Sequence, residues 1–114
     1  MVTVVNKKSH KPTSNDIFIG RGGSALGNIF THIPSGTKAL HVVATREIAI
    51  DSYRNWLQGK IETGNPQVLS ALRAIFFRLQ AGEDINLVCY CKPLPCHGDV
   101  IIEFLTRYES ILSK

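Results

Sequence analysis

One stretch decides the fold of this chain: residues 86–99, which read NLVCYCKPLPCHGD. Its first part is apolar at nearly every position, as in a strand that is buried on both faces of a parallel sheet. Prolines then stiffen a loop, and the last helix starts near Asp99. In small α/β domains, a strand end followed by a loop and a helix is a common place for a binding site. The segment is therefore expected to supply the central strand of a sheet and one wall of a site.

Three shorter apolar runs predict further strands, at residues 2–5, 16–20 and 39–44. The run at 39–44 is either a third strand or the return arm of a hairpin. A polar segment containing Pro12 connects the first two strands, and residues 30–38 are predicted to form a loop.

Two amphipathic helices are predicted in the middle of the chain. Thr45 and Asn65 are suitable N-cap residues, and apolar residues recur at helical spacing after each of them. The first helix is expected to end near Lys60, and Gly82 is expected to stop the second. The interleaved order of strands and helices predicts a single α/β domain over residues 1–114. We expect three layers around a short, mostly parallel sheet with flanking helices.

The composition is that of an ordinary globular domain, with 44% hydrophobic and 19% charged residues among 114. No apolar run reaches the ~18–20 residues of a membrane helix. The first residues carry their apolar part before their charge, the reverse of a secretory signal, so a cytoplasmic protein is expected. The three cysteines are an odd number, which favours metal ligands or reactive thiols over a disulfide scaffold. A net charge of +4 permits a nucleotide or nucleic acid as partner.

A glycine-rich loop follows the second predicted strand. Gly20, Gly22 and Gly23 allow the backbone to approach a ligand closely, and backbone N–H groups in such a loop can bind an anion. Arg21 would add a guanidinium group suited to phosphate. The spacing matches neither the dinucleotide fingerprint nor the P-loop, so a plain turn is the alternative.

The cysteine-containing loop has three interpretations, of which the first is a metal site. Cys89, Cys91, Cys96 and His97 together supply three thiolates and one imidazole, which is a tetrahedral zinc set by composition. Their spacing differs from that of most zinc modules and would make a cramped site. On this interpretation the chain is a zinc-stapled interaction protein without enzymatic activity.

The second interpretation is a thiol nucleophile. Cys96 lies near the start of a helix and beside His97, a position that favours the thiolate. The arginine-closed loop of tyrosine phosphatases is absent, because His97 is the only basic residue within six positions after Cys96.

The third interpretation is a ligand pocket. The helix start at Gly98 would bind a phosphate or carboxylate, and His97 or Asp99 would contact the rest of the ligand. The cysteines would pack as small apolar side chains. Asp99 is the first candidate for proton transfer and His97 the second. Alternatively, Asp99 only stabilises the first turn of the helix.

Three segments resemble the motifs of a small uncharacterised domain family found in phages and bacteria. Its members carry an early GR…WGNPF segment, a TRE…YRxWL helix and a late C-[WY]-C-x-P-x-P-C-H-G-D-V segment. The corresponding positions here are Arg21 with residues 27–30, residues 45–57 and residues 89–100. Leu26 stands where the family tends to have Trp, and Ile29 where it has Pro. The resemblance covers about residues 16–112.

The family is a domain of unknown function. Its strand-to-helix turn is similar to that of another uncharacterised α/β family with a Cys-His-Arg turn. The resemblance implies a Rossmann-like nucleotide-binding fold, which favours the pocket over zinc. The phage distribution implies a role in phage nucleotide metabolism or counter-defence, in the cytoplasm of a bacterial host cell.

The sequence therefore predicts binding of a nucleotide-like phosphate ligand, with hydrolysis or transfer as a further step. Arg46 is a candidate second cation, and direct nucleic-acid binding through the cluster of Lys7, Lys8 and Lys11 is another alternative. The candidate ligand-binding residues are Gly20, Arg21, Gly22, Gly23, Asn28, Arg46, Cys96, His97, Gly98 and Asp99.

Overall fold

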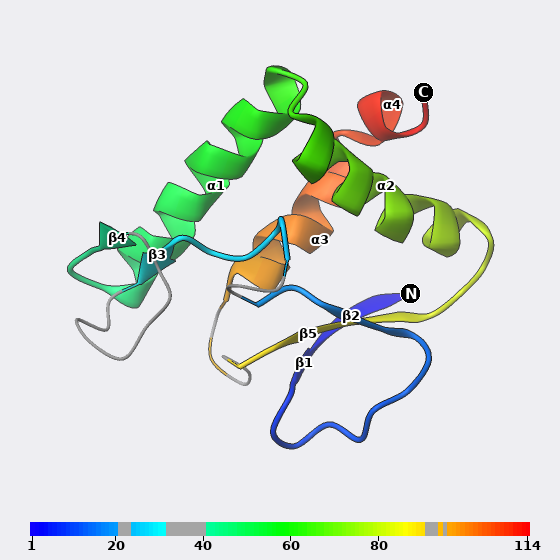
Figure 1. Ribbon diagram of the computed structural model, residues 1–114, viewed down its shortest axis with the longest axis horizontal. Helices are drawn as coiled ribbons and strands as arrows, with labels where there is room; N and C mark the ends of the chain where they lie inside the picture. Colours follow the sequence, from blue (N-terminus) through cyan, green and yellow to red (C-terminus); the bar gives the residue numbers. More distant parts are fainter. Residues whose placement is uncertain (21–23, 32–40, 91–93, 95) are drawn as a thin grey trace.

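The computed structural model describes residues 1–20, 24–31, 41–90, 94 and 96–114. The candidate residues Arg21, Gly22, Gly23 and Cys91 lie outside the described residues. The elements follow one another as β1 (Val2–Asn6), β2 (Asp16–Phe18), β3 (Phe30–Thr31), β4 (His41–Val42), α1 (Arg46–Glu62), α2 (Pro66–Gln80), β5 (Ile85–Cys89), α3 (His97–Arg107) and α4 (Glu109–Leu112). The predicted α/β class, with a short parallel sheet and flanking helices, is confirmed (Figure 1).

The main sheet has three parallel strands in the order β1-β5-β2. The predicted central position of the strand before the cysteine loop is therefore confirmed. Leu87 of β5 pairs with Val4 on one side and Ile17 on the other, and its side chain is fully buried. β5 ends at Cys89, and Tyr90 already lies in a bend, so the strand is shorter than its apolar run.

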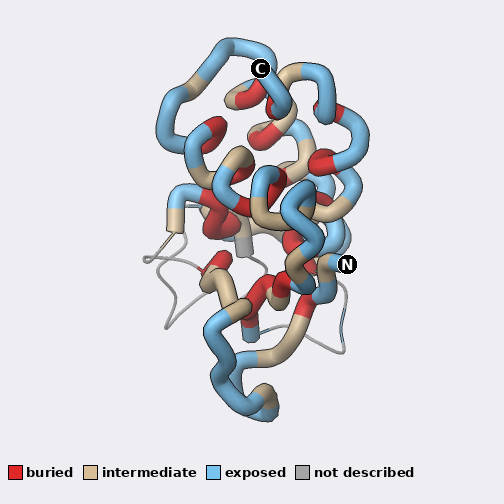
Figure 2. The backbone as a smooth tube through the Cα atoms, turned by 90° about the vertical axis from the view of Figure 1, so that its right-hand side faces the viewer, coloured by how far each residue is buried: buried red, intermediate tan, exposed pale blue. Residues whose placement is uncertain are grey.

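The connection between β1 and β2 is a loop, residues 7–15. Because both strands run parallel to β5, this loop returns from the carboxyl end of β1 to the amino end of β2. Asp16 anchors it, since its carboxylate contacts the imidazole Nε2 of His10 at 2.9 Å and accepts a hydrogen bond from the Thr13 amide at 3.0 Å. The described helices all lie on the other side of the sheet, while this loop is largely exposed (Figures 1 and 2). Among the described residues, helices therefore cover one face of the sheet, and the expected third layer is replaced by this loop.

Helix ends follow the predicted caps. The Thr45 side chain accepts a hydrogen bond from the Ile48 amide at 3.1 Å, and Asn65 caps α2 in the same way through the Val68 amide at 3.0 Å. Gly82 follows the end of α2 with a φ of 89°, a left-handed conformation that glycine adopts without strain.

The last predicted helix is divided into α3 and α4. The backbone at Tyr108 leaves helical geometry, with φ −106° and ψ 24°. Its ring packs edge-on against Phe104, with the ring centroids 5.2 Å apart. Apolar side chains continue into the core across this break, and Leu112 of α4 is fully buried.

The strand predicted at 39–44 has a different role from the one expected. Of its described residues 41–44, His41–Val42 pairs in parallel with Phe30–Thr31, so it is neither a hairpin arm nor part of the main sheet. Phe30 was predicted to lie in a loop but belongs to β3. Its ring stacks on the His41 imidazole, with centroids 5.2 Å apart, so a side-chain contact accompanies the backbone pairing of the two short segments.

The core lies between the helices and the sheet. Large side chains from α1, α2, β5 and α3 are fully buried there: Tyr53, Leu57, Leu72, Ile75, Leu87, Ile101 and Phe104. The leucine, isoleucine and phenylalanine side chains among them each contribute about 1.5–3 kcal/mol relative to an exposed position. Among the described residues, no helix has the length and apolar character needed to cross a membrane.

Candidate functional site

The site lies at the carboxyl ends of β2 and β5, where both strands meet the first turn of α3. His97 Nε2 donates a hydrogen bond of 2.6 Å to the carbonyl oxygen of Ile19, which follows β2. Cys96 Sγ lies 3.4 Å from Sγ of Cys89, the last residue of β5. The first turn of α3 is thus fixed to two neighbouring strand ends at once.

The start of α3 is capped by its own side chains. Cys96 is the N-cap residue, and its sulfur accepts a hydrogen bond from the Gly98 amide at 3.3 Å. The Asp99 carboxylate accepts one from the Cys96 amide at 3.2 Å, which completes a capping box with cysteine in the place of serine or threonine. Asp99 is nevertheless exposed, so a carboxylate lies beside the positive end of the helix dipole.

His97 belongs to a buried network that joins α3 to α1. The side chain is 5% exposed, and its ring packs edge-on against Tyr53 with centroids 5.1 Å apart. The Tyr53 hydroxyl in turn donates a hydrogen bond of 2.7 Å to the Leu26 carbonyl oxygen, and burial raises the pKa of Tyr53 far above its ordinary value. Since a carbonyl oxygen can only accept, His97 Nε2 carries a proton in this arrangement. Through these contacts, His97 holds the first turn of α3 against α1 and the end of β2.

The two described cysteines form a buried thiol pair. Cys89 is 1% and Cys96 is 2% exposed, and their sulfur atoms lie 3.4 Å apart. Of the four candidate zinc ligands, the structure brings these two together, whereas His97 Nε2 is directed at Ile19. Cys91 lies outside the described residues, and within those residues no group of three or more His, Cys, Asp or Glu side chains could hold a metal.

Two candidate glycines allow close packing at this edge. A Cβ atom at Gly98 would lie 2.8 Å from Val4 Cγ2 and 3.0 Å from Ile19 Cδ1, so α3 can approach the sheet only with glycine there. A Cβ atom at Gly20 would lie 2.2 Å from the Phe18 ring. Both residues therefore have a structural reason to be glycine, separate from any ligand.

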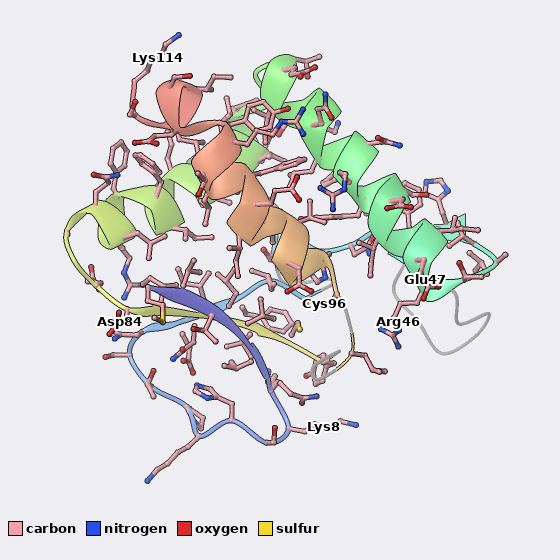
Figure 3. The ribbon with its side chains drawn as sticks, turned by 180° about the vertical axis from the view of Figure 1, so that it is seen from behind. Lys8, Arg46, Glu47, Asp84, Cys96 and Lys114 are labelled. Atoms are coloured by element: carbon pink, nitrogen blue, oxygen red, sulfur yellow. The ribbon has the colours of Figure 1, made fainter. Side chains whose placement is uncertain are left out.

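Of the remaining candidates, Asn28 contacts α1, and Arg46 is the first residue of α1. Asn28 is buried, and its side chain accepts a hydrogen bond from the Phe30 amide at 2.9 Å and donates one to the Ala49 carbonyl oxygen at 3.5 Å. Arg46 is half-buried in the first turn of α1, and Cys96 marks the start of α3 (Figure 3). The amino ends of both helices lie on the same side of the molecule as the carboxyl ends of β2 and β5 (Figure 1).

A second cluster at the same strand ends was not predicted as a unit. Lys7 Nζ lies 5.0 Å from the centroid of the Phe18 ring and 6.0 Å from that of Tyr90. The sequence does contain a signal for part of this cluster, because side chains alternate between the two faces of a strand. Tyr90 follows Cys89 directly, so the two side chains are expected on opposite faces.

Comparison with known proteins finds similarity to a family model. A family model described as "Domain of unknown function (DUF4326)" matches residues 2–107, which include every described element from β1 to α3. No curated protein and no solved structure matches the chain.

Proposed function

The chain belongs to the DUF4326 family, a domain of unknown function, and we propose that it binds a nucleotide-like phosphate ligand. The observation that carries the proposal is the position of the amino end of α3. It lies against the carboxyl ends of two parallel strands, through the contacts of His97 with Ile19 and of Cys96 with Cys89. Ligands of parallel sheets bind beyond these strand ends, and helix amino ends favour phosphate.

The proposed roles divide between holding the site and contacting the ligand. Cys96, His97 and Gly98 are buried and hold α3 in place. Arg21 and the neighbouring glycine backbone would bind the phosphate, with Arg46 as a second cation.

Asp99 gives the proposal its catalytic extension. Its exposed carboxylate is the proposed group for accepting a proton from an attacking water, if the bound phosphate ester is cleaved. A nucleotide ligand would suit a role in phage nucleotide metabolism or counter-defence, in the cytoplasm of the host cell.

The test is thermal unfolding with a panel of nucleoside monophosphates, diphosphates, triphosphates and cyclic nucleotides. A bound nucleotide at one hundred times its Kd stabilises the fold by about 2.7 kcal/mol, which raises Tm by several degrees. Arg21→Ala should abolish the rise. Arg107→Ala, an exposed arginine in the last turn of α3, is the matched control and should retain it. The absence of any rise across the panel would contradict the proposal.

Asp99→Asn separates binding from catalysis. Asparagine keeps a side-chain oxygen that can accept the hydrogen bond from the Cys96 amide, so the cap should persist. It cannot act as a base. This variant should therefore keep the nucleotide-dependent rise in Tm and lose any hydrolysis that the wild type shows, measured as phosphate release.

A further inference from the structure

Three strand ends bring two aromatic rings and one cation together outside the site described above. Lys7 follows β1, Phe18 ends β2 and Tyr90 follows β5. The two rings are edge to face, with centroids 6.3 Å apart and an interplanar angle of 79°. The Lys7 ammonium lies within 6.0 Å of both ring centroids. We call these three residues the strand-end cluster.

The strand-end cluster lies on the face of the sheet that the helices do not cover. Val4 contacts the α3 residue Gly98, so Val4 and its register partner Leu87 point toward the helices. Phe18 pairs with Val88, the residue after Leu87, and therefore points the other way. Tyr90 follows two residues after Val88, on the same face as Phe18. The cluster is thus separated from the buried first turn of α3 by the sheet itself.

The backbone holds the cluster in place without a ligand. The Lys7 amide donates a hydrogen bond of 2.7 Å to the Cys89 carbonyl oxygen, and the Asn6 side chain donates one of 3.2 Å to the Tyr90 carbonyl oxygen. Gly20 leaves the space that the Phe18 ring occupies. A platform that is ordered in advance loses little conformational entropy when a ligand binds.

The surroundings of the cluster are positively charged. Residues 7–15 contain three lysines and no aspartate or glutamate. Lys8 extends outward from the ribbon (Figure 3). The carboxylate that follows the loop, Asp16, is hydrogen-bonded by Thr13, His10 and Asn86. Tyr90 is 53% exposed, so an aromatic surface is accessible beside this charge.

We infer that the strand-end cluster and the lysines of residues 7–15 bind single-stranded nucleic acid. An unpaired base would stack on Tyr90, and the phosphates on either side would contact Lys7, Lys8 and Lys11. Aromatic stacking with cations along the backbone is the usual way in which proteins bind single strands without reading sequence. A duplex offers the same phosphates but keeps its base faces stacked, so the exposed ring favours the single strand.

The test is fluorescence anisotropy with end-labelled oligonucleotides of about 12 nucleotides, as oligo-dT, oligo-U and a duplex. The wild type should bind the single strands more tightly than the duplex. Tyr90→Ala should weaken single-strand binding by about 5- to 150-fold, the loss of one stacked base, while Tyr90→Phe should retain it. Lys7→Gln should lower the slope of log affinity against log salt by about 0.7, measured between about 50 and 200 mM salt.

Two matched variants control for the loss of a ring or a charge. Phe77→Ala removes an aromatic side chain that is 49% exposed on α2, and Lys60→Gln removes a lysine whose Nζ lies 6.0 Å from the Trp56 ring. Both should bind oligonucleotides as the wild type does. Urea unfolding of each variant checks that the fold persists.

Three results would overturn the inference. The first is no binding at about 50 mM salt, and the second is equal weakening by Tyr90→Ala and Phe77→Ala. The third is an acidic peptide that displaces the oligonucleotide and itself depends more strongly on Tyr90, which would indicate a protein partner.

Discussion

The two faces of the sheet differ most sharply at the carboxyl ends of the strands. On the helix side, Cys89, Cys96 and His97 are each at most 5% exposed and contact one another's segments. On the opposite side, Lys7 and Tyr90 are exposed and contact each other across neighbouring strand ends. The thiol and imidazole side chains, which are the most reactive here, therefore stabilise the fold, whereas a lysine and a tyrosine face the solvent.

The difference shows that residue type alone does not separate a structural site from a binding site. Cys89 and Tyr90 are neighbours in the chain, yet the two-residue period of a strand sends one into the core and the other to the surface. Substitutions on the helix side should therefore reduce stability. Substitutions on the opposite side should alter binding and leave stability nearly unchanged.

The largest expected effect is that of His97→Ala. The change leaves a cavity beside Tyr53 and removes the donor to the Ile19 carbonyl oxygen. It should lower the free energy of unfolding by about 3 kcal/mol, measured by urea denaturation. Tyr90→Ala should stay within about 0.5 kcal/mol of the wild type. Similar losses in the two variants would erase the distinction between the two faces.

Gly98→Ala should have the next largest effect and lower the free energy of unfolding by about 1–2 kcal/mol, because the new Cβ atom would clash with Val4 and Ile19. Gly59→Ala is the matched control, since this exposed glycine of α1 has nothing within 4 Å of the new atom. It should stabilise the protein by about 0.5–1 kcal/mol through helix propensity. Equal effects in the two variants, measured by urea denaturation, would show that α3 does not depend on close contact with the sheet.

Asp99→Ala should cost about 0.5–1 kcal/mol, because it removes the carboxylate that accepts from the Cys96 amide. Asp99→Asn should cost less, since the amide oxygen can replace the acceptor. Thermal unfolding without ligand measures both. A loss in the asparagine variant as large as that in the alanine variant would mean that charge, and not the hydrogen bond, stabilises the first turn of α3.

The smallest effect concerns Asp16, which anchors the loop on the exposed face. The hydrogen bond from the Thr13 amide holds the pKa of Asp16 well below its ordinary value. Partial burial acts in the opposite direction, and hydrogen bonds with His10, the Thr13 hydroxyl and Asn86 lower the pKa further. Because the folded pKa is the lower one, Asp16 stabilises the fold above its ordinary pKa. This contribution is lost as the pH falls below about 5 toward the folded value.

Asp16→Asn should therefore flatten the dependence of Tm on pH below about pH 5. Near neutral pH, its Tm should lie below that of the wild type. The two curves should converge as the solution is acidified. Parallel curves would show that Asp16 does not titrate differently in the folded and unfolded protein.

The sequence was informative where the structure depends on local patterns. The strands β1, β2 and β5 follow apolar runs, and the caps at Thr45 and Asn65 follow from side chains that bond to amides three residues away. The position of β5 at the centre of the sheet followed from its nearly continuous apolar sequence. The convergence of the β2 and β5 ends follows from the geometry of a parallel sheet, and the pairing of Phe18 with Val88 shows it directly.

The sequence could not predict features that depend on distant contacts. The parallel pairing of Phe30 with His41 joins two segments that are not adjacent in the chain, and their rings stack. The burial of His97 depends on Tyr53, which lies more than forty residues away in the chain. The strand-end cluster was missed for the same reason, because its members Lys7, Phe18 and Tyr90 come from three strands that are joined only by the fold.

The position of β5 also sets the order in which the protein can fold during synthesis. β1 and β2 do not pair with each other, and their shared partner, Ile85–Cys89, is the last of the three strands to be synthesised. At about 5–20 residues per second, β2 remains without a hydrogen-bonding partner for roughly 3 to 13 seconds and β1 for roughly 4 to 16 seconds. Helices α1 and α2 can form during that interval, because their hydrogen bonds are local. The three-stranded sheet should therefore assemble in a single late step, when β5 pairs with β1 and β2, which have already been synthesised.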